Sequence, residues 1–433
     1  MRILILHAGG LGDLVLAAGF VERLRLQHEA SHITLACRDE YAGTCELYPS
    51  PPDRIITTTV NSYGWAAPCD ELVESVRPLL AQIEPEGFER FFSAEHRATW
   101  LGPIVAARAR AAESVISNMP YAQRWFVVSM LRRLGLHAVA LHHVDAQPGE
   151  HELVRYERLA GATSEGLVPK WRVSKANADE AAGALAAYGW KPGRLLACFP
   201  FGDAGTTFKR WPSERFLAVL EAAHARFALP VLAFGAQDER TELDAFVAAL
   251  SARGVIAATF AGTKDDIALA GALLRASLAY IGNDTGLAHL AAAYGVPGVT
   301  IFGGGTWPAY APWNAASVGL VAPLPCFGCY WDCAFGRGLC VEQVDVESAS
   351  AALGEVIALA DDVPRTISLD RGTPAERELI GLAARRYAQA QEDRNARLTS
   401  VLRLRDVLER GIRLRSARRT AAEVRLIPEA GGG

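Results

Sequence analysis

Long apolar runs are missing from this chain. No window approaches the roughly 18 uninterrupted apolar residues of a membrane-spanning helix, which argues against a transmembrane segment. The first residues, 1–7, are apolar, but Gly9, Gly10 and Asp13 interrupt them before a signal-peptide core is complete. We therefore expect a cytoplasmic protein.

Cysteine is also scarce, and the chain as a whole has no excess of positive charge. Eight cysteines in 433 residues are too few for a disulfide scaffold, and Cys37, Cys45, Cys69 and Cys198 are expected to be small buried side chains. The formal net charge of −4 gives no reason to expect nucleic acid as a partner. Half of the residues are hydrophobic and 21% are charged, as in a globular protein with a large core.

The charge is unevenly distributed. Residues 364–433 contain 15 Arg but only 9 Asp or Glu, so the C-terminal region is basic and the rest is acidic. Leucines and valines between 398 and 414 have the spacing of an amphipathic helix. We expect a basic helical extension over 363–433, which either contacts anionic inner-membrane lipid or is a solvated or oligomerising helix.

Apolar β-like runs alternate with helical patterns twice along the chain. This alternation predicts an α/β protein with two Rossmann-like, doubly wound domains facing a cleft, over 1–175 and 176–362. The region 304–340 is expected to be a long irregular loop. The predicted strands are 2–7, 32–37, 54–60, 89–93 and 114–117, then 195–200, 230–234, 255–260, 278–281 and 298–302.

The turn after the first strand lacks the G-x-G-x-x-G spacing of a dinucleotide-binding fingerprint, so NAD binding is disfavoured. Asp13 falls at the start of the following helix, where it would face the cleft. It is a candidate general base, although a carboxylate at a helix start can also serve only to complement the helix dipole.

The most informative segment is 280–290, in which an apolar strand breaks at Gly-Asn-Asp-Thr-Gly and a helix follows. Asp284 or Thr285 can cap that helix, Gly286 allows close backbone approach, and first-turn N–H groups attract a diphosphate. With Leu287 and His289 these residues form a candidate donor-binding turn. The alternative is an ordinary capped α/β turn.

Two further strand-to-helix turns carry polar side chains. The segment 201–212 offers the hydroxyls of Thr206 and Thr207 and the mobile charge of Lys209, which could neutralise a leaving diphosphate. Pro212 would occupy the first position of the next helix. Gln237 and Glu239 could contact a ribose or a base, but such residues are often only helix caps.

These segments, in this order, resemble the ADP-heptose:lipopolysaccharide heptosyltransferase family, glycosyltransferase family 9. The resemblance covers roughly 1–360 and is most specific at 282–289, followed by Gly295-Val296-Pro297. It also rests on 2–13, on Lys209-Arg210-Trp211-Pro212 with Arg215-Phe216, and on Phe234-Gly235 and Phe260-Ala261-Gly262.

The resemblance implies a GT-B fold with a nucleotide-diphosphate-heptose donor, such as ADP-heptose, in the second domain and an acceptor on the first. It implies inverting transfer that needs no catalytic metal. By position, Asp13 looks like the family's base and Lys209 like its diphosphate contact. Asp284, Thr285, Gly286 and His289 match its donor-phosphate and sugar region.

Two segments depart from the family pattern. The stretch 303–308 reads Gly-Gly-Gly-Thr-Trp-Pro where the family usually has a loop like Gly-Pro-Thr-Asp-Pro. The stretch 93–97 replaces the more usual Asp-x-Gln on the acceptor side, which leaves the acceptor open.

The other four cysteines, Cys326, Cys329, Cys333 and Cys340, lie together in the long loop. Such a cluster could hold a structural zinc or iron ion, remain as unpaired thiols, or form disulfides. A structural role is favoured over a catalytic one.

We therefore expect a metal-independent, inverting glycosyltransferase that moves heptose or a related sugar from a nucleotide diphosphate to a lipopolysaccharide-core or other glycan acceptor. A protein hydroxyl as acceptor is an alternative. A non-transferring nucleotide-sugar epimerase or sugar-binding scaffold is another, and would bind donor without glycosylating any acceptor.

Overall fold

The computed structural model describes residues 1–62, 69–96, 99–117, 121–147, 149–162, 166–167, 171–202, 204–314, 316–324, 326–331, 333, 335–358 and 365–368. Of the predicted extension over 363–433, residues 363–364 and 369–433 lie outside the described residues. So does the side chain of Cys69, whereas Cys37, Cys45 and Cys198 are buried as expected.

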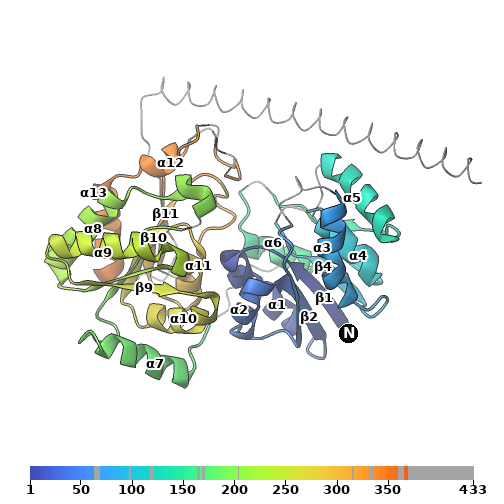
Figure 1. Cartoon of the computed structure of the whole chain (residues 1–433), viewed down its shortest axis with the longest axis horizontal. Helices are drawn as coiled ribbons and strands as arrows, with labels where there is room; N and C mark the ends of the chain where they lie inside the picture. The colour runs from blue at the N-terminus through green and yellow to red at the C-terminus, as the bar shows by residue number, and fades with distance from the viewer. Residues whose placement is uncertain are drawn as a thin grey trace, which may run out of the picture.

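The first domain is built on a six-stranded parallel sheet in the order β3-β2-β1-β4-β5-β6. Helices cover it on both faces (Figure 1). The strands are β1 Arg2–His7, β2 His32–Arg38, β3 Arg54–Thr58, β4 Arg90–Ser93, β5 Glu113–Ile116 and β6 His142–His143. The helices are α1 Leu11–Gln27, α2 Ala42–Glu46, α3 Cys69–Ala81, α4 Leu101–Ala109, α5 Tyr121–Leu134 and α6 Glu152–Leu159.

The second domain has a seven-stranded parallel sheet in the order β13-β12-β11-β10-β7-β8-β9. Its strands are β7 Leu196–Phe199, β8 Val231–Ala236, β9 Ala257–Gly262, β10 Ala279–Asn283, β11 Gly298–Phe302, β12 Ser317–Val321 and β13 Arg365–Ser368. Its helices are α7 Lys175–Ala186, α8 Ser213–Phe227, α9 Arg240–Ala252, α10 Ile267–Arg275, α11 Gly286–Ala293, α12 Leu339–Glu342 and α13 Val346–Ala358.

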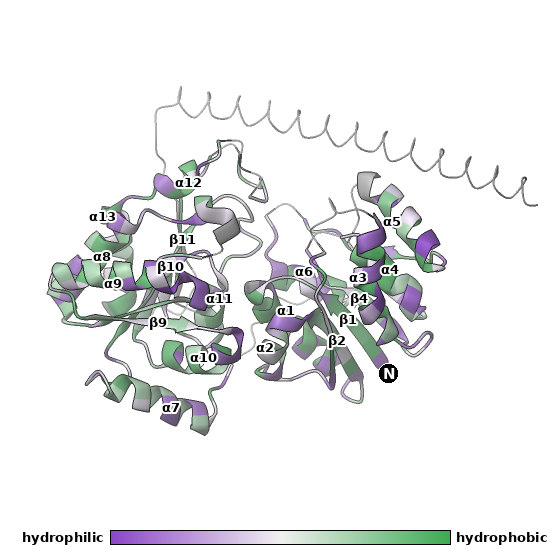
Figure 2. Ribbon diagram, in the orientation of Figure 1, coloured by the Kyte–Doolittle hydropathy of each residue, from purple (hydrophilic) through white to green (hydrophobic). Residues whose placement is uncertain are grey.

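The central strands are apolar on both faces because helices cover both faces. Ile3, Leu4, Ile5 and Leu6 of β1 are all fully buried, so the strand reads as a continuous apolar run. Figure 2 shows the hydrophobic colour concentrated in strands such as β1 and β2. In each sheet the strand order reverses once, between β1 and β4 and between β7 and β10. Ligands of such folds bind outside the carboxyl ends of the strands at these points.

The structure corrects several details of the sequence-based prediction. The region 304–340 is not entirely irregular, since it contains β12 and the start of α12. Strand β13 extends the second sheet beyond the expected boundary at 362. Helix α8 begins at Ser213, with Pro212 in the N-cap position and not the first helical position. The short edge strand β6 was also missed.

The two domains meet along α1 and α11, which pack against each other. Their amino ends lie at the carboxyl edges of the two sheets, after β1 and β10 respectively. Within the described residues, we find no helix with the length and apolar character needed to cross a membrane.

Candidate active site between the two domains

Asp13 stands in the first turn of α1, immediately after β1. Its Oδ2 accepts the N–H of Gly10 at 2.7 Å, which fixes the carboxylate over the glycine turn. A Cβ on Gly9 would lie only 2.7 Å from the Asp13 side chain, so the turn needs a glycine there. The glycines after β1 thus serve to seat a carboxylate, as well as to bend the chain.

The turn between β10 and α11 is fastened by Asn283. Its side chain accepts the N–H of Trp211 at 2.8 Å and donates to the carbonyl of Pro200 at 2.8 Å, so it ties together the ends of two adjacent strands. Thr285 occupies the N-cap position of α11 but makes no capping hydrogen bond. Its buried hydroxyl has no hydrogen-bond partner among the described residues, which leaves it available to a ligand.

The two turns touch each other. A Cβ on Gly12 would lie 2.6 Å from the His289 ring, and one on Gly286 would lie 2.8 Å from Leu11. These glycines let the helix starts approach so closely that the charge of Asp13 acts on Asp284 across the domain boundary. The structure therefore brings the predicted base and the predicted donor turn into one site.

Lys209 is the cation of this site. Its charge acts on both Asp284 and His289, so its ammonium group lies near the start of α11. Lys209 ends the 3-10 segment Ala204–Lys209, in which Thr206 has non-helical backbone angles. Thr207, in the same segment, is exposed to solvent.

Asp284 and His289 are both buried, and burial shifts both towards their neutral forms. Burial raises the pKa of Asp284 to about 6; Lys209 opposes the rise and Asp13 adds to it. Burial, together with the charges of His151 and Lys209, lowers the pKa of His289 to about 3. A proton on Asp284 reduces the negative charge that an incoming diphosphate would meet.

Glu239 and Gln237 have separate places in the structure. The Glu239 carboxylate accepts the N–H groups of Gly202 at 2.8 Å and Ala236 at 2.9 Å, and lies 3.3 Å from Arg210. It therefore joins the ends of β7 and β8. Gln237 is exposed at the end of β8. Their predicted contacts with a ribose or a base stay predictions.

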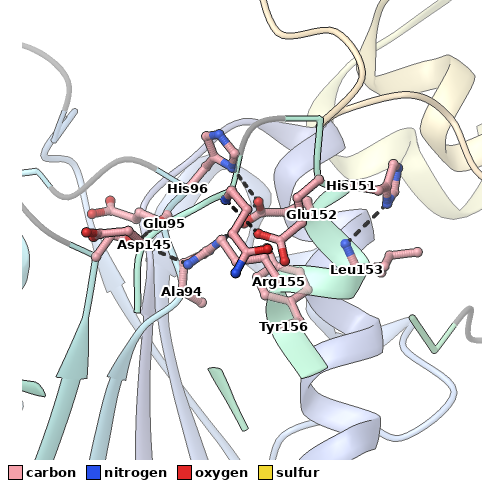
Figure 3. Close-up of polar contacts among 12 residues, drawn as sticks. Ala94, Glu95, His96, Asp145, His151, Glu152, Leu153, Arg155 and Tyr156 are labelled. Carbon is pink, nitrogen blue, oxygen red and sulfur yellow. Dashed lines mark hydrogen bonds and ion pairs between the residues drawn. The ribbon is translucent and has the colours of Figure 1, made fainter. Parts of the chain in front are cut away.

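The first domain contains a buried polar network that the sequence analysis did not predict (Figure 3). Arg155 and Glu152 of α6 are both fully buried and form an ion pair. Arg155 also donates to the carbonyl of Ala94 at 2.6 Å and to the Ser117 hydroxyl at 3.1 Å. The opposite side of the carboxylate meets His96 Nδ1 at 2.5 Å.

This network stays charged despite its burial. Burial alone would raise the pKa of Glu152, but Arg155 and His96 outweigh it and lower that pKa to about 2. Beside the network, burial raises the pKa of Glu95, which accepts hydrogen bonds from Ser62 and Thr99, both at 2.6 Å. Ser93, Glu95 and His96, which lie where the family usually has Asp-x-Gln, are therefore buried hydrogen-bonding groups.

The start of α6 is joined to the second domain. The N–H of Glu152 donates to the carbonyl of Ala309 at 2.9 Å, and His151 Nε2 lies 2.8 Å from the carbonyl oxygen of Ala311. The His151 ring also packs on Trp313, with centroids 4.5 Å apart. These contacts were not predictable from local sequence, because they join segments about 160 residues apart.

The four clustered thiols lie close enough to influence one another. Burial raises the pKa of Cys326 to about 11, and the charges of Cys340, Cys329 and Cys333 add to the rise. In the part of the chain that the structure describes, no three Cys, His, Asp or Glu side chains converge as metal ligands. The predicted zinc or iron ion at this cluster stays a prediction.

Known proteins share both the sequence pattern and the fold. The model of glycosyltransferase family 9 (heptosyltransferase) matches residues 128–331, which include Lys209 and the turn after β10. No curated protein matches this sequence significantly.

Many solved structures are similar to this chain, and three of them illustrate the likeness. The glycosyl transferase family 9 from Veillonella parvula DSM 2008 is 20% identical, with 82% of this chain and 97% of that chain covered and a TM-score of 0.62. The E. coli ADP-heptose lps heptosyltransferase II is 16% identical, with 83% and 99% covered and a TM-score of 0.60. The E. coli heptosyltransferase WaaC with ADP is 15% identical, with 82% and 100% covered and a TM-score of 0.56. Residues 128–331 thus match glycosyltransferase family 9, and the resemblance to this family and the GT-B fold inferred from the sequence are confirmed.

Proposed function

We propose that this chain transfers a heptose, or a related sugar, from a nucleoside diphosphate to a hydroxyl group of a glycan acceptor such as lipopolysaccharide core. The observation that carries the proposal is the contact between the starts of α1 and α11, which brings the charges of Asp13 and Lys209 close enough to act on Asp284. The E. coli heptosyltransferase WaaC has been solved with ADP and with ADP-2-deoxy-2-fluoro heptose, which supports ADP-heptose as the donor.

In the proposed reaction Asp13 accepts the proton of the acceptor hydroxyl while that oxygen attacks the anomeric carbon. The bond from this carbon to the diphosphate oxygen breaks in the same step, so the configuration inverts. Lys209 and the N-terminal end of α11 stabilise the negative charge that grows on the departing diphosphate. One base and a stabilised leaving group suffice, and no metal takes part in the proposed step.

The donor is tested by thermal shift with a panel of nucleotide sugars, followed by transfer assays with the donor that binds. Saturation at about 100 times Kd adds close to 3 kcal/mol of stability, which is a readily measured shift in Tm. We expect ADP-heptose to give the largest shift and to glycosylate a lipopolysaccharide-core acceptor. Binding of a donor without transfer to any acceptor, glycan or protein, would contradict the proposal and favour an epimerase or a binding scaffold.

Donor binding should weaken as the pH rises through about 6, where Asp284 loses its proton. The ionised carboxylate would face the diphosphate, so affinity should fall by up to about tenfold per pH unit above the pKa. A nucleotide sugar is the right probe, because its diphosphate is esterified at both ends and keeps its charge across this range. Calorimetric titrations at a series of pH values measure the slope.

Asp284→Asn is the matched variant, since the amide keeps the shape and cannot ionise. Its affinity for the same nucleotide sugar should be nearly independent of pH over this range. Equal slopes for the variant and the native chain would remove Asp284 from the donor site.

We also propose a cytoplasmic location, where nucleotide sugars are available. The predicted contact of the basic extension with inner-membrane lipid concerns residues outside the described part of the chain, and it stays a prediction.

A further inference from the structure

The segment 326–331 is seated on the three glycines 303–305 at the end of β11. A Cβ on Gly305 would lie 2.3 Å from the ring of Trp331, and one on Gly304 would lie 2.0 Å from Phe327. The N–H of Tyr330 donates to the carbonyl of Gly305 at 2.8 Å. The glycines that replace the family's usual residues therefore make room for two aromatic rings.

Tyr330 and Trp331 both have left-handed backbone angles, with φ of 50° and 63°. Bulky residues rarely adopt such angles, and they are retained only where the surroundings impose them. The two neighbouring side chains contact different domains. The Tyr330 hydroxyl lies 3.4 Å from His96 Nε2 in the first domain, whereas the Trp331 ring lies 4.4 Å from Lys209 Nζ in the second.

The contact between Trp331 and Lys209 is a cation–π interaction, because the ammonium nitrogen lies well within 6 Å of the ring centroid. Lysine has a flexible four-carbon stem, so an unsupported ammonium group would sample many positions. Phe208, which precedes Lys209, also packs on the Trp331 ring, at 6.2 Å between centroids. The ring thus supports the lysine and the residue before it.

We propose that Trp331 is a positioning residue that holds the Lys209 ammonium group towards the start of α11, and that Tyr330 fastens the same segment to His96 of the first domain. The inference rests on the proposed function for the role of Lys209 at the diphosphate. The cysteine-rich loop would then have a role in the reaction, through the position of Lys209, that was not predicted from the sequence. In this arrangement Trp331 acts through Lys209.

The test is a double-mutant cycle between Trp331→Leu and Lys209→Met. In the native background Trp331→Leu should lower kcat by about three- to thirtyfold, the range expected for a lost cation–π contact, and change the donor KM much less. In the Lys209→Met background the same substitution should change kcat by less than about twofold. Trp331→Phe, which keeps an aromatic face, should recover most of the loss.

A second variant is designed to displace the Trp331 ring while Trp331 and Lys209 both keep their native side chains. Gly305→Ala places a Cβ against Trp331, so it should displace the ring and reproduce the loss in kcat. Melting temperatures of all variants show whether they fold. If Trp331→Leu does not fold, Trp331→Phe and Gly305→Ala decide the question in the same cycle.

The cycle is repeated for binding of ADP alone, measured by calorimetry, so that it does not depend on sugar transfer. If the native chain transfers no sugar, the proposed function fails while the ADP cycle still reports the coupling between Trp331 and Lys209. Equal factors for Trp331→Leu with and without Lys209, in both kcat and ADP affinity, would overturn the inference.

Discussion

Asp13→Asn should lower turnover by about two orders of magnitude or more, the usual cost of removing a general base. The amide cannot take the proton of the acceptor hydroxyl, although it can still accept the N–H of Gly10 that the carboxylate accepts at 2.7 Å. The turn and the donor site should therefore persist. Steady-state kinetics together with calorimetric titration of the donor separates the two effects, with kcat reduced and donor affinity nearly unchanged.

Asp345 provides the matched control. Its carboxylate accepts the N–H of Ser348 at 2.7 Å at the start of α13, so it makes the same kind of helix-start hydrogen bond away from α1 and α11. Asp345→Asn should leave turnover within about twofold of the native value. Near-normal turnover of Asp13→Asn would show that this carboxylate only complements the helix dipole.

Arg155→Met should destabilise the first domain by about 3–5 kcal/mol, because it leaves the Glu152 carboxylate buried without its cation. The substitution also removes the donors to the Ala94 carbonyl and the Ser117 hydroxyl. Chemical denaturation followed by circular dichroism measures the loss. Part of it should be regained as the pH falls, since an unpaired buried carboxyl group takes up a proton more readily.

Two further variants isolate the ion pair. Combining Arg155→Met with Glu152→Gln should be less damaging than Arg155→Met alone, because no charge is then left unpaired. Lys175→Met breaks the exposed pair between Lys175 and Asp179 and should cost at most about 0.5 kcal/mol. A loss for Arg155→Met as small as that of Lys175→Met would mean that the buried pair contributes little to stability.

Local sequence patterns predicted most of the fold. Strands with a continuous apolar run, such as β1 and β11, were found with their observed bounds, because burial on both faces leaves a clear signal. Strand β6 is only His142–His143 and is exposed, so it carries no such signal. Strand β12 was missed inside a region rich in glycine and proline, where its apolar run is short.

The same contrast holds for the candidate site, where some features have a local sequence signal and others do not. The turns at Asp13 and Asp284 could be predicted because a strand, a glycine turn and a helix follow one another within a few residues. The pairing of Glu152 with His96 spans 56 residues, and the contact of Tyr330 with His96 spans 234. The first contact depends on the tertiary packing within the first domain and the second on how the two domains pack, and no spacing in the sequence encodes either.

Strand β13 shows that the C-terminal region begins with a strand of the second domain's sheet. Residues 365–368 hydrogen-bond to β12 in parallel register and form one edge of the seven-stranded sheet. A chain shortened before Arg365 would expose the main-chain donors and acceptors of β12, and a bare margin of this kind invites strand addition from another molecule. Residues 365–368 therefore cover the edge of the second domain's sheet, and any shortened version of the protein needs to retain them.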